Sequence, residues 1–186
     1  MSEKIRKTSA YKICLIAFAI CINLIGGQIA LFLKLPIYLD SIGTVLIASV
    51  MGPFYGMLPN LISGLLMGIT VDIYSLYYAP VGIILGFVTG LVYKKYQPRK
   101  GWVLLAAVVI TIPSTIVSAC ITAFVFGGIT SSGSSLIVQI LAKTPLGMVG
   151  SCFVVQFITD YIDRVICLYI VAILVKALPK KMRENV

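Results

Sequence analysis

The residues of this sequence that could do chemistry are a few polar side chains that interrupt long apolar runs. Asp160, Asp163 and Arg164 form the densest ionisable group, and the two acids would lie one turn apart on a helix. The chain has no histidine, the commonest general base and metal ligand. It also lacks the GxxxxGK[ST], HExxH and GxSxG motifs. We therefore expect a protein that is not an enzyme and that has no metal and no cofactor.

A binding pocket is the function that these polar residues favour. Ionisable groups in an apolar setting are costly unless they are paired or face a cavity. Tyrosines beside them would supply walls for a small, flat, polar heterocycle. The opposing interpretation is a belt of interfacial aromatic residues, with charges that cap helix ends in water. The pocket candidates are Gln28, Tyr38, Asp40, Asp72, Tyr74, Tyr77, Gln139, Lys143, Asp160, Asp163 and Arg164.

Long apolar helices are the elements that must position these side chains. Hydrophobic residues make up 60% of the 186 residues and charged residues only 11%, too little polar surface for a water-soluble domain. A helix needs ~20 mostly apolar residues to cross ~30 Å of hydrocarbon. We therefore expect an all-α integral membrane protein with about six transmembrane helices. The expected spans are 10–33, 42–55, 57–78, 80–95, 102–126 and 158–178, with the long segment 127–157 lying on, or dipping into, the outer face.

The positions of the basic residues predict the orientation of the chain. Cytoplasmic loops of membrane proteins collect Lys and Arg. With the N-terminus inside, all fifteen basic residues except Lys34, Lys143 and Arg164 fall on the cytoplasmic side, and both termini are cytoplasmic. We expect a single transmembrane substrate-binding domain, 1–186, with short basic tails at 1–9 and 179–186. This bias and anionic lipid account for the net charge of +9, so no nucleic-acid partner is expected.

Small residues recur at every fourth position in the predicted helices, which places them on one helix face where backbones can approach closely. Tight packing within the bundle is the favoured interpretation, and a docking face for another membrane protein is the alternative. Asn60 lies on the same face and is expected to latch onto a neighbouring helix, with a ligand contact as the alternative. The residues are Gly52, Gly56, Asn60, Gly64 and Gly68, followed by Gly82, Gly86 and Gly90.

Two stretches of the sequence carry a family resemblance that covers most of the chain. The motifs LPxxLDxIGT and GPxxGxxxN stand here as LPIYLDSIGT and GPFYGMLPN within Leu35–Leu65, and IDRVICLYIVAILVKALPKKMR follows at Ile162–Arg183. With these stretches the chain resembles the substrate-binding S components of energy-coupling factor (ECF) vitamin transporters, a type of ABC transporter. The resemblance implies capture of a vitamin or precursor from outside. Delivery would then pass through a separate module of one transmembrane coupling protein and two cytoplasmic ATPases.

The resemblance also implies where that module docks and what the pocket holds. The family docks through small residues at AxxxA spacing on the first helix. The nearest matches here are Ala10 with Cys14 and Ala17 with Cys21, so the literal motif is missing. The LDxIGT variant is most similar to members assigned to pyridoxine or hydroxymethylpyrimidine. Binders of cobalamin, pantothenate, niacin and queuosine precursors share the scaffold and stay open as alternatives.

Two other classes of membrane protein stay open. One is the membrane sensor region of a signalling protein, although a sensor would normally continue into a kinase or cyclase domain. The other is a self-sufficient carrier or channel, although no inverted repeat or conducting polar stripe is evident in the sequence. The absence of an ATP-binding motif favours a subunit that depends on partners for energy.

Overall fold

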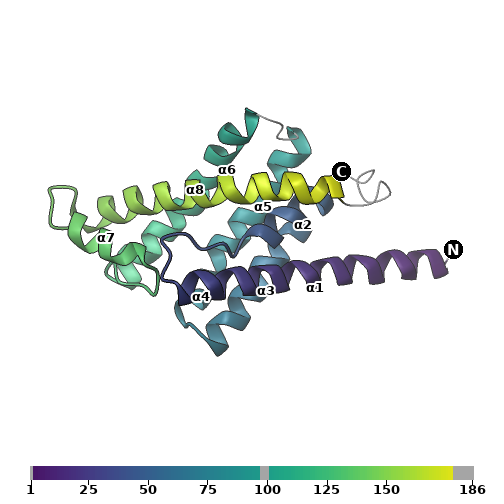
Figure 1. The fold of residues 1–186 in the computed structure, drawn as a ribbon, viewed down its shortest axis with the longest axis horizontal. Coiled ribbons are helices and arrows are strands. Elements are labelled where there is room, and N and C mark those ends of the chain that lie inside the picture. Colours follow the sequence, from purple (N-terminus) through teal and green to yellow (C-terminus); the bar gives the residue numbers. More distant parts are fainter. Residues whose placement is uncertain (1, 97–100, 178–186) are drawn as a thin grey trace.

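The computed structural model describes residues 2–96 and 101–177, with side chains from residue 10 onward, and this part of the chain is helical without a strand. The expected all-α class is therefore confirmed. The helices are α1 (Ser2–Phe32), α2 (Ile42–Met51), α3 (Pro53–Thr70), α4 (Tyr74–Tyr77), α5 (Ala79–Lys95), α6 (Trp102–Cys120) with a π-helical turn η1 (Ile121–Val125), α7 (Ser134–Leu141) and α8 (Gly147–Ala177) (Figure 1).

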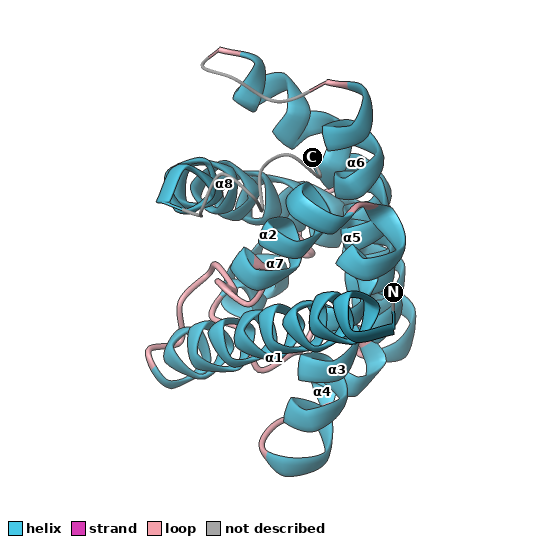
Figure 2. Ribbon diagram, turned by 90° about the vertical axis from the view of Figure 1, so that its right-hand side faces the viewer, coloured by secondary structure: helices cyan, strands magenta, loops and turns pink. Residues whose placement is uncertain are grey.

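Two long helices, α1 and α8, run antiparallel along the long axis of the molecule, and the shorter helices pack between and beside them (Figures 1 and 2). Helix α2 is the central element, because it contacts α1, α3, α5 and α8. Its residues from Gly43 to Val50 are all buried. The main core joins α2 to α5, α6 and α8 through residues such as Val45, Leu85, Ile110 and Leu168. The two ends of the described chain lie at the same end of the bundle (Figure 1).

Close backbone contacts join α3 to α5. A Cβ atom on Gly86 would lie 2.2 Å from the carbonyl oxygen of Gly56, and one on Gly82 would lie 2.3 Å from the Asn60 amide oxygen. A Cβ on Gly90 would lie 2.3 Å from the Cα of Pro53. Any side chain at these positions would force the two helices apart.

The other glycines of the four-residue pattern have different surroundings. Gly68 packs against Leu76 of α4. A Cβ atom on Gly64 would meet only the Ser75 carbonyl oxygen, at 3.4 Å. Gly52 has open space around it and a φ of +85°, so it ends α2 in a conformation that favours glycine. Pro53 then begins α3, where a missing N–H costs nothing.

The last helix and the ends of the chain differ from the expected spans. Helix α8 begins at Gly147 rather than at 158, and α7 packs against it through a small core that includes Val138, Cys152 and Val155. Segment 127–157 therefore contains the whole of α7 and the first turns of α8. Residues 2–9 continue α1 as helix rather than forming a separate tail. The expected tail at 179–186 lies outside the described residues.

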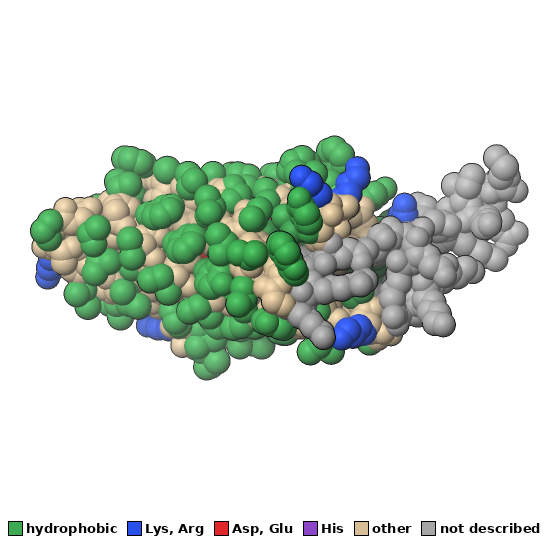
Figure 3. Space-filling view, turned by 90° about the horizontal axis from the view of Figure 1, so that it is seen from above, with side chains coloured by type: hydrophobic (Ala, Val, Ile, Leu, Met, Phe, Trp, Pro, Cys, Tyr) green, Lys and Arg blue, Asp and Glu red, His purple; other side chains and the backbone are tan. Residues whose placement is uncertain are grey.

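Two stretches of the described chain are long and apolar enough to cross a membrane, Ala10–Phe32 and Trp102–Val125. Many large apolar side chains on the surface are exposed, among them Phe18, Ile69, Phe124 and Ile173. The face in Figure 3 is covered mainly by hydrophobic side chains, with few basic ones. An apolar surface of this extent is unusual for a soluble monomer.

Candidate binding cavity

A polar cavity of about 70 Å³ lies between α1, α3 and two loops. We call the loops loop 33–41, which joins α1 to α2, and loop 126–133, which joins η1 to α7. The wall combines carboxylates, amides and hydroxyls with a few apolar side chains. It is formed by Asn23, Gly27, Ala30, Leu31, Leu35, Ile37, Tyr38, Asp40, Asn60, Ser63, Gly64, Met67, Asp72, Ser75, Ser131 and Ser132.

Loop 33–41 is held tightly against its neighbours. Gly26 of α1 lets the loop approach, because a Cβ there would lie 2.1 Å from the Leu39 carbonyl oxygen. A Cβ on Gly133 would likewise lie 2.1 Å from the carbonyl oxygen of Lys34. Lys34 and Leu39 themselves have positive φ angles, 49° and 52°, which are uncommon for residues with a side chain. The backbone N–H of Leu39 donates to Asp163 Oδ1 at 3.0 Å, which ties the loop to α8.

The two acidic residues of the cavity wall, Asp40 and Asp72, come from different elements. Asp40 lies in loop 33–41, and its Oδ1 accepts a hydrogen bond from Ser41 Oγ at 2.9 Å. Asp72 follows α3, and its Oδ2 accepts from Ser131 Oγ at 2.7 Å and from Ser75 Oγ at 3.4 Å. The Ser131 contact pins loop 126–133 over the cavity.

Amides and a phenol complete the polar wall. Asn23 is buried and donates to Thr44 Oγ1 at 2.9 Å, while its Oδ1 accepts from the N–H of Gly43 at 2.8 Å. Asn60 lies both on the wall and against Gly82. Burial raises the pKa of the Tyr38 phenol to about 12, with a smaller contribution from the nearby Asp160 and Asp40 carboxyls. Tyr38 is therefore neutral at pH 7 and can donate or accept a hydrogen bond.

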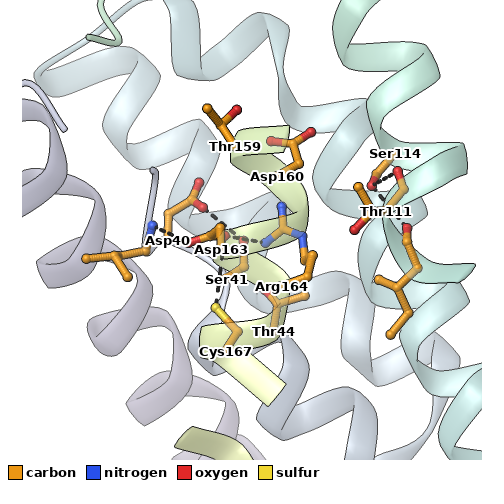
Figure 4. Close-up of polar contacts among 12 residues, drawn as sticks. Asp40, Ser41, Thr44, Thr111, Ser114, Thr159, Asp160, Asp163, Arg164 and Cys167 are labelled. Atoms are coloured by element: carbon orange, nitrogen blue, oxygen red, sulfur yellow. Dashed lines mark hydrogen bonds and ion pairs between the residues drawn. The ribbon is translucent and has the colours of Figure 1, made fainter. Parts of the chain in front are cut away.

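A second polar cluster lies in α8 behind loop 33–41 (Figure 4). Arg164 Nη1 donates to Asp163 Oδ2 at 2.8 Å, and Thr115 of α6 donates to Asp160 Oδ2 at 2.6 Å. Asp160, Asp163 and Arg164 are all buried, and none of them lines the cavity. Their hydrogen bonds orient loop 33–41 and join α8 to α6, which is a supporting role.

Aromatic residues gather beside the cavity on Phe126. The rings of Tyr74 and Tyr77 lie 4.7 and 5.2 Å from the Phe126 ring, and that of Tyr78 lies 6.2 Å from it. The Tyr78 hydroxyl lies 2.5 Å from Thr122 Oγ1, which also accepts a hydrogen bond from Gln156. These rings pack α4 against the end of the π-helical turn and do not line the cavity.

The eleven pocket candidates from the sequence thus separate into groups. Tyr38, Asp40 and Asp72 line the cavity. Gln28 and Lys143 are exposed away from the wall, and Gln139 donates to the Gly127 carbonyl oxygen at 3.2 Å. The remaining candidates belong to the α8 cluster and the Phe126 aromatic group. Sequence reasoning did not include Asn23, Ser63, Ser75, Ser131 or Ser132 in the pocket, although the polar run GGITSSGSS marked the loop that holds two of them.

The four small residues of α1 that the family resemblance singles out lie on the outside of the bundle. Ala10, Cys14, Ala17 and Cys21 are all exposed. No metal-binding group of three or more His, Cys, Asp or Glu residues occurs in the described part of the chain. Comparison with protein-family models, curated proteins and solved structures finds no significant match for the chain.

Proposed function

We propose that this protein is the substrate-binding S component of an ECF-type vitamin uptake transporter in a bacterial cytoplasmic membrane. The observation that carries the proposal is a polar cavity inside a helical bundle whose outer surface is largely apolar. The cavity suits capture of a small solute, because hydrogen-bonding groups from α1, loop 33–41, α3, the segment 72–75 and loop 126–133 converge on one space. The resemblance of Leu35–Leu65 and Ile162–Arg183 to this family supports the same function.

The proposed arrangement is multi-pass, with about six spans, of which Ala10–Phe32 and Trp102–Val125 are long and apolar enough to cross a membrane by themselves. Exposed apolar side chains on α1, α3, α6 and α8 match a hydrocarbon environment, where every backbone group must be satisfied within the protein, as helices do. Helix α8 has 31 residues and exceeds the length that ~30 Å of hydrocarbon requires. Both termini would then face the cytoplasm, as the distribution of Lys and Arg predicts.

The proposed ligand is a small hydroxylated heterocycle of the pyridoxine or hydroxymethylpyrimidine class. The cavity of about 70 Å³ is far too small for a corrin such as cobalamin, and it would have to widen to admit even a single-ring heterocycle. Hydroxyl and ring-nitrogen groups would find partners among Asn23, Asn60, Tyr38 and the serines of the wall. The wall offers binding groups without a histidine or metal site, so binding without catalysis is the proposed activity.

Transport against a gradient would depend on a coupling protein and two ATPases, because the chain has no ATP-binding motif of its own. The exposed face of α1 formed by Ala10, Cys14, Ala17 and Cys21 is the proposed docking site for the coupling protein. Small residues at four-residue spacing let another helix approach closely. Tyr11, Phe18 and Ile25 are exposed on the same helix and would add apolar contact area.

A bulky substitution on the proposed docking face is expected to affect transport without affecting ligand binding. Ala17→Trp should retain ligand binding by the purified protein and abolish ATP-driven uptake in vesicles that contain the coupling module. Cys120→Trp is the matched control, because Cys120 is an exposed small residue on α6, and it should retain both activities. Uptake by the Ala17→Trp protein would disprove the docking site, and pumping by the isolated chain would disprove the proposed function.

A further inference from the structure

The cavity wall is acidic and has no basic side chain. Asp40 and Asp72 both line it, and no Lys or Arg is among the lining residues. Within the described part of the chain, the donors that reach these two carboxylates are serine hydroxyls. Neither carboxylate forms an ion pair with a described Lys or Arg.

No described basic side chain lines the cavity or forms an ion pair with Asp40 or Asp72. Arg164 lies behind loop 33–41, and its Nη1 bonds to Asp163 Oδ2 at 2.8 Å. The Arg164 guanidinium also interacts electrostatically with Asp160 and, more weakly, with Asp40, so its one positive charge is shared among three carboxylates. Lys34 and Lys143 are exposed and do not line the cavity. Negative charge therefore predominates at the wall.

Carboxylates differ from the other polar groups of the wall, because an ionised carboxylate only accepts hydrogen bonds. Asn23, Asn60, Tyr38 and the serines can adapt to a donor or an acceptor on the ligand. Asp40 and Asp72 instead bind N–H donors and cationic groups of a ligand, and they repel its hydrogen-bond acceptors and anionic groups. A charged group in an apolar bundle is costly unless it is paired or faces a cavity, so a ligand that compensates both acids gains most.

We propose that the ligand of this cavity meets Asp40 and Asp72 with N–H donors or positive charge, and that anionic vitamins are excluded. This inference rests on the proposed function and names the chemistry of the solute. It favours an amino-substituted heterocycle, because hydrogen bonds between charged or strongly polarised N–H groups and carboxylates are about twice as strong as neutral ones. It excludes pantothenate and nicotinate, whose carboxylates would face Asp40 and Asp72.

Matched ligand pairs test this preference by isothermal titration of the full chain in detergent. One pair is 4-amino-5-hydroxymethyl-2-methylpyrimidine and its 4-hydroxy counterpart, which lacks the exocyclic amine. The other is pyridoxamine and 4-pyridoxate, in which an ammonium is replaced by a carboxylate. In at least one pair, the affinity of the amino member should exceed that of its counterpart about tenfold or more. The two anionic compounds, 4-pyridoxate and pantothenate, should show no binding. Equal or tighter binding of the carboxylate or hydroxy members would overturn the inference.

Substitutions of Asp40 and Asp72 test whether these carboxylates cause the preference for the amino ligand. Asp72→Asn and Asp40→Asn should each reduce the preference for the amino member about tenfold, whereas Thr144→Ala, an exposed site on another segment, should keep it. A melting temperature close to that of the unmodified protein shows that a variant is folded. An unchanged preference in folded Asp72→Asn protein would contradict the inference. Tight binding of an anionic vitamin would refute this inference alone, whereas the absence of binding by every compound would refute the proposed function as well.

Discussion

At the scale of single residues, two aspartates in similar apolar surroundings have different tasks. Asp163 accepts hydrogen bonds from the Leu39 backbone and from Arg164, and the side chains of Asp163 and Arg164 are buried. Asp72 lies on the cavity wall and accepts from two serines. The first carboxylate therefore holds the protein together, whereas the second faces the space that a ligand would occupy.

Asp163→Asn should lower stability strongly. The amide would offer one acceptor oxygen in place of two, so Arg164 or the Leu39 N–H would lose its partner inside the bundle. Removing one member of a buried ion pair costs about 3–5 kcal/mol. Thermal unfolding in detergent would show a lower melting temperature, and ligand affinity would fall because loop 33–41 is released from α8. A melting temperature equal to that of the unmodified protein would contradict the supporting role of Asp163.

Asp72→Asn should show the opposite pattern. Its two partners are hydroxyls that can rotate to suit an amide, so the melting temperature should change little. Ligand affinity should fall about tenfold or more, because hydrogen bonds to charged groups contribute about 1.5–3 kcal/mol. Titration of both variants side by side makes the comparison. A large loss of stability without a loss of affinity would place Asp72 outside the binding site.

Tyr38 makes a prediction about alkaline pH. Burial raises the pKa of its phenol from 10.0 to about 12, so the folded protein keeps the proton at a pH where the unfolded chain loses it. The contribution to stability is complete below about pH 10 and is lost as the pH rises toward about 12. Tyr38→Phe should therefore reduce the slope of melting temperature against pH in this window. The same slope in both proteins would show that the phenol is not protected.

At the scale of elements, the contact of α3 with α5 is the clearest case of glycine-dependent packing. Gly86→Ala would place a methyl group 2.2 Å from the Gly56 carbonyl oxygen. We expect a cost of about 1–3 kcal/mol from overpacking, measured as a lower melting temperature. Gly101→Ala is the matched control, because a Cβ at Gly101 meets nothing within 4 Å, and it should leave the melting temperature unchanged. Equal effects of the two substitutions would contradict the close approach of α3 and α5.

Sequence patterns located most helices, because long apolar runs bounded by Pro, Gly or Lys mark their ends. Helix α5 ends at Lys95, as the paired lysines indicate. The expected boundary between spans 42–55 and 57–78 was wrong, because α2 ends at Met51 and Pro53 begins α3, which itself ends at Thr70. The expected start of the last helix at 158 was wrong, because α8 begins at Gly147 and its first turns carry no charged residue that would mark a helix start. A helix start with no polar cap has little local signal.

The cavity was predictable only in part. Tyr38, Asp40 and Asp72 stand out as polar residues between apolar runs, and they do line it. Asn23 and Ser63 lie inside apolar helices with nothing in the sequence to distinguish a ligand contact from an internal hydrogen bond. Ser131 reaches the wall only because loop 126–133 folds over α3 and bonds to Asp72, a contact across 59 residues of sequence. Local patterns do not encode such long-range contacts.

At the scale of the whole molecule, the bundle predicts a common location for both ends of the chain. The N-terminal end of α1 and the C-terminal end of α8 lie at the same end of the bundle in Figure 1, and the proposed orientation places that end on the cytoplasmic side. A green fluorescent protein fused to the C-terminus should therefore fluoresce in intact cells, and an alkaline phosphatase fused there should be inactive. An active phosphatase fusion would contradict the proposed orientation.

The apolar surface and the polar interior also belong together at this scale. Large apolar side chains are exposed on several helices, and the cavity brings polar side chains of separate segments together inside the bundle. A protein of this kind can hold a solute without any catalytic group. The central claim is therefore that the space between α1, α3, loop 33–41 and loop 126–133 is a solute-binding site.

Native mass spectrometry of the detergent-released protein tests this claim most directly. The unmodified chain should carry one small organic molecule. Gly64→Leu, which fills the cavity, should carry none, while Gly101→Leu, in open space, should carry it as before. The Gly64→Leu protein must keep a cooperative melting transition for the comparison. An unmodified protein that binds no small molecule, or a filled cavity that retains the same molecule, would contradict the account.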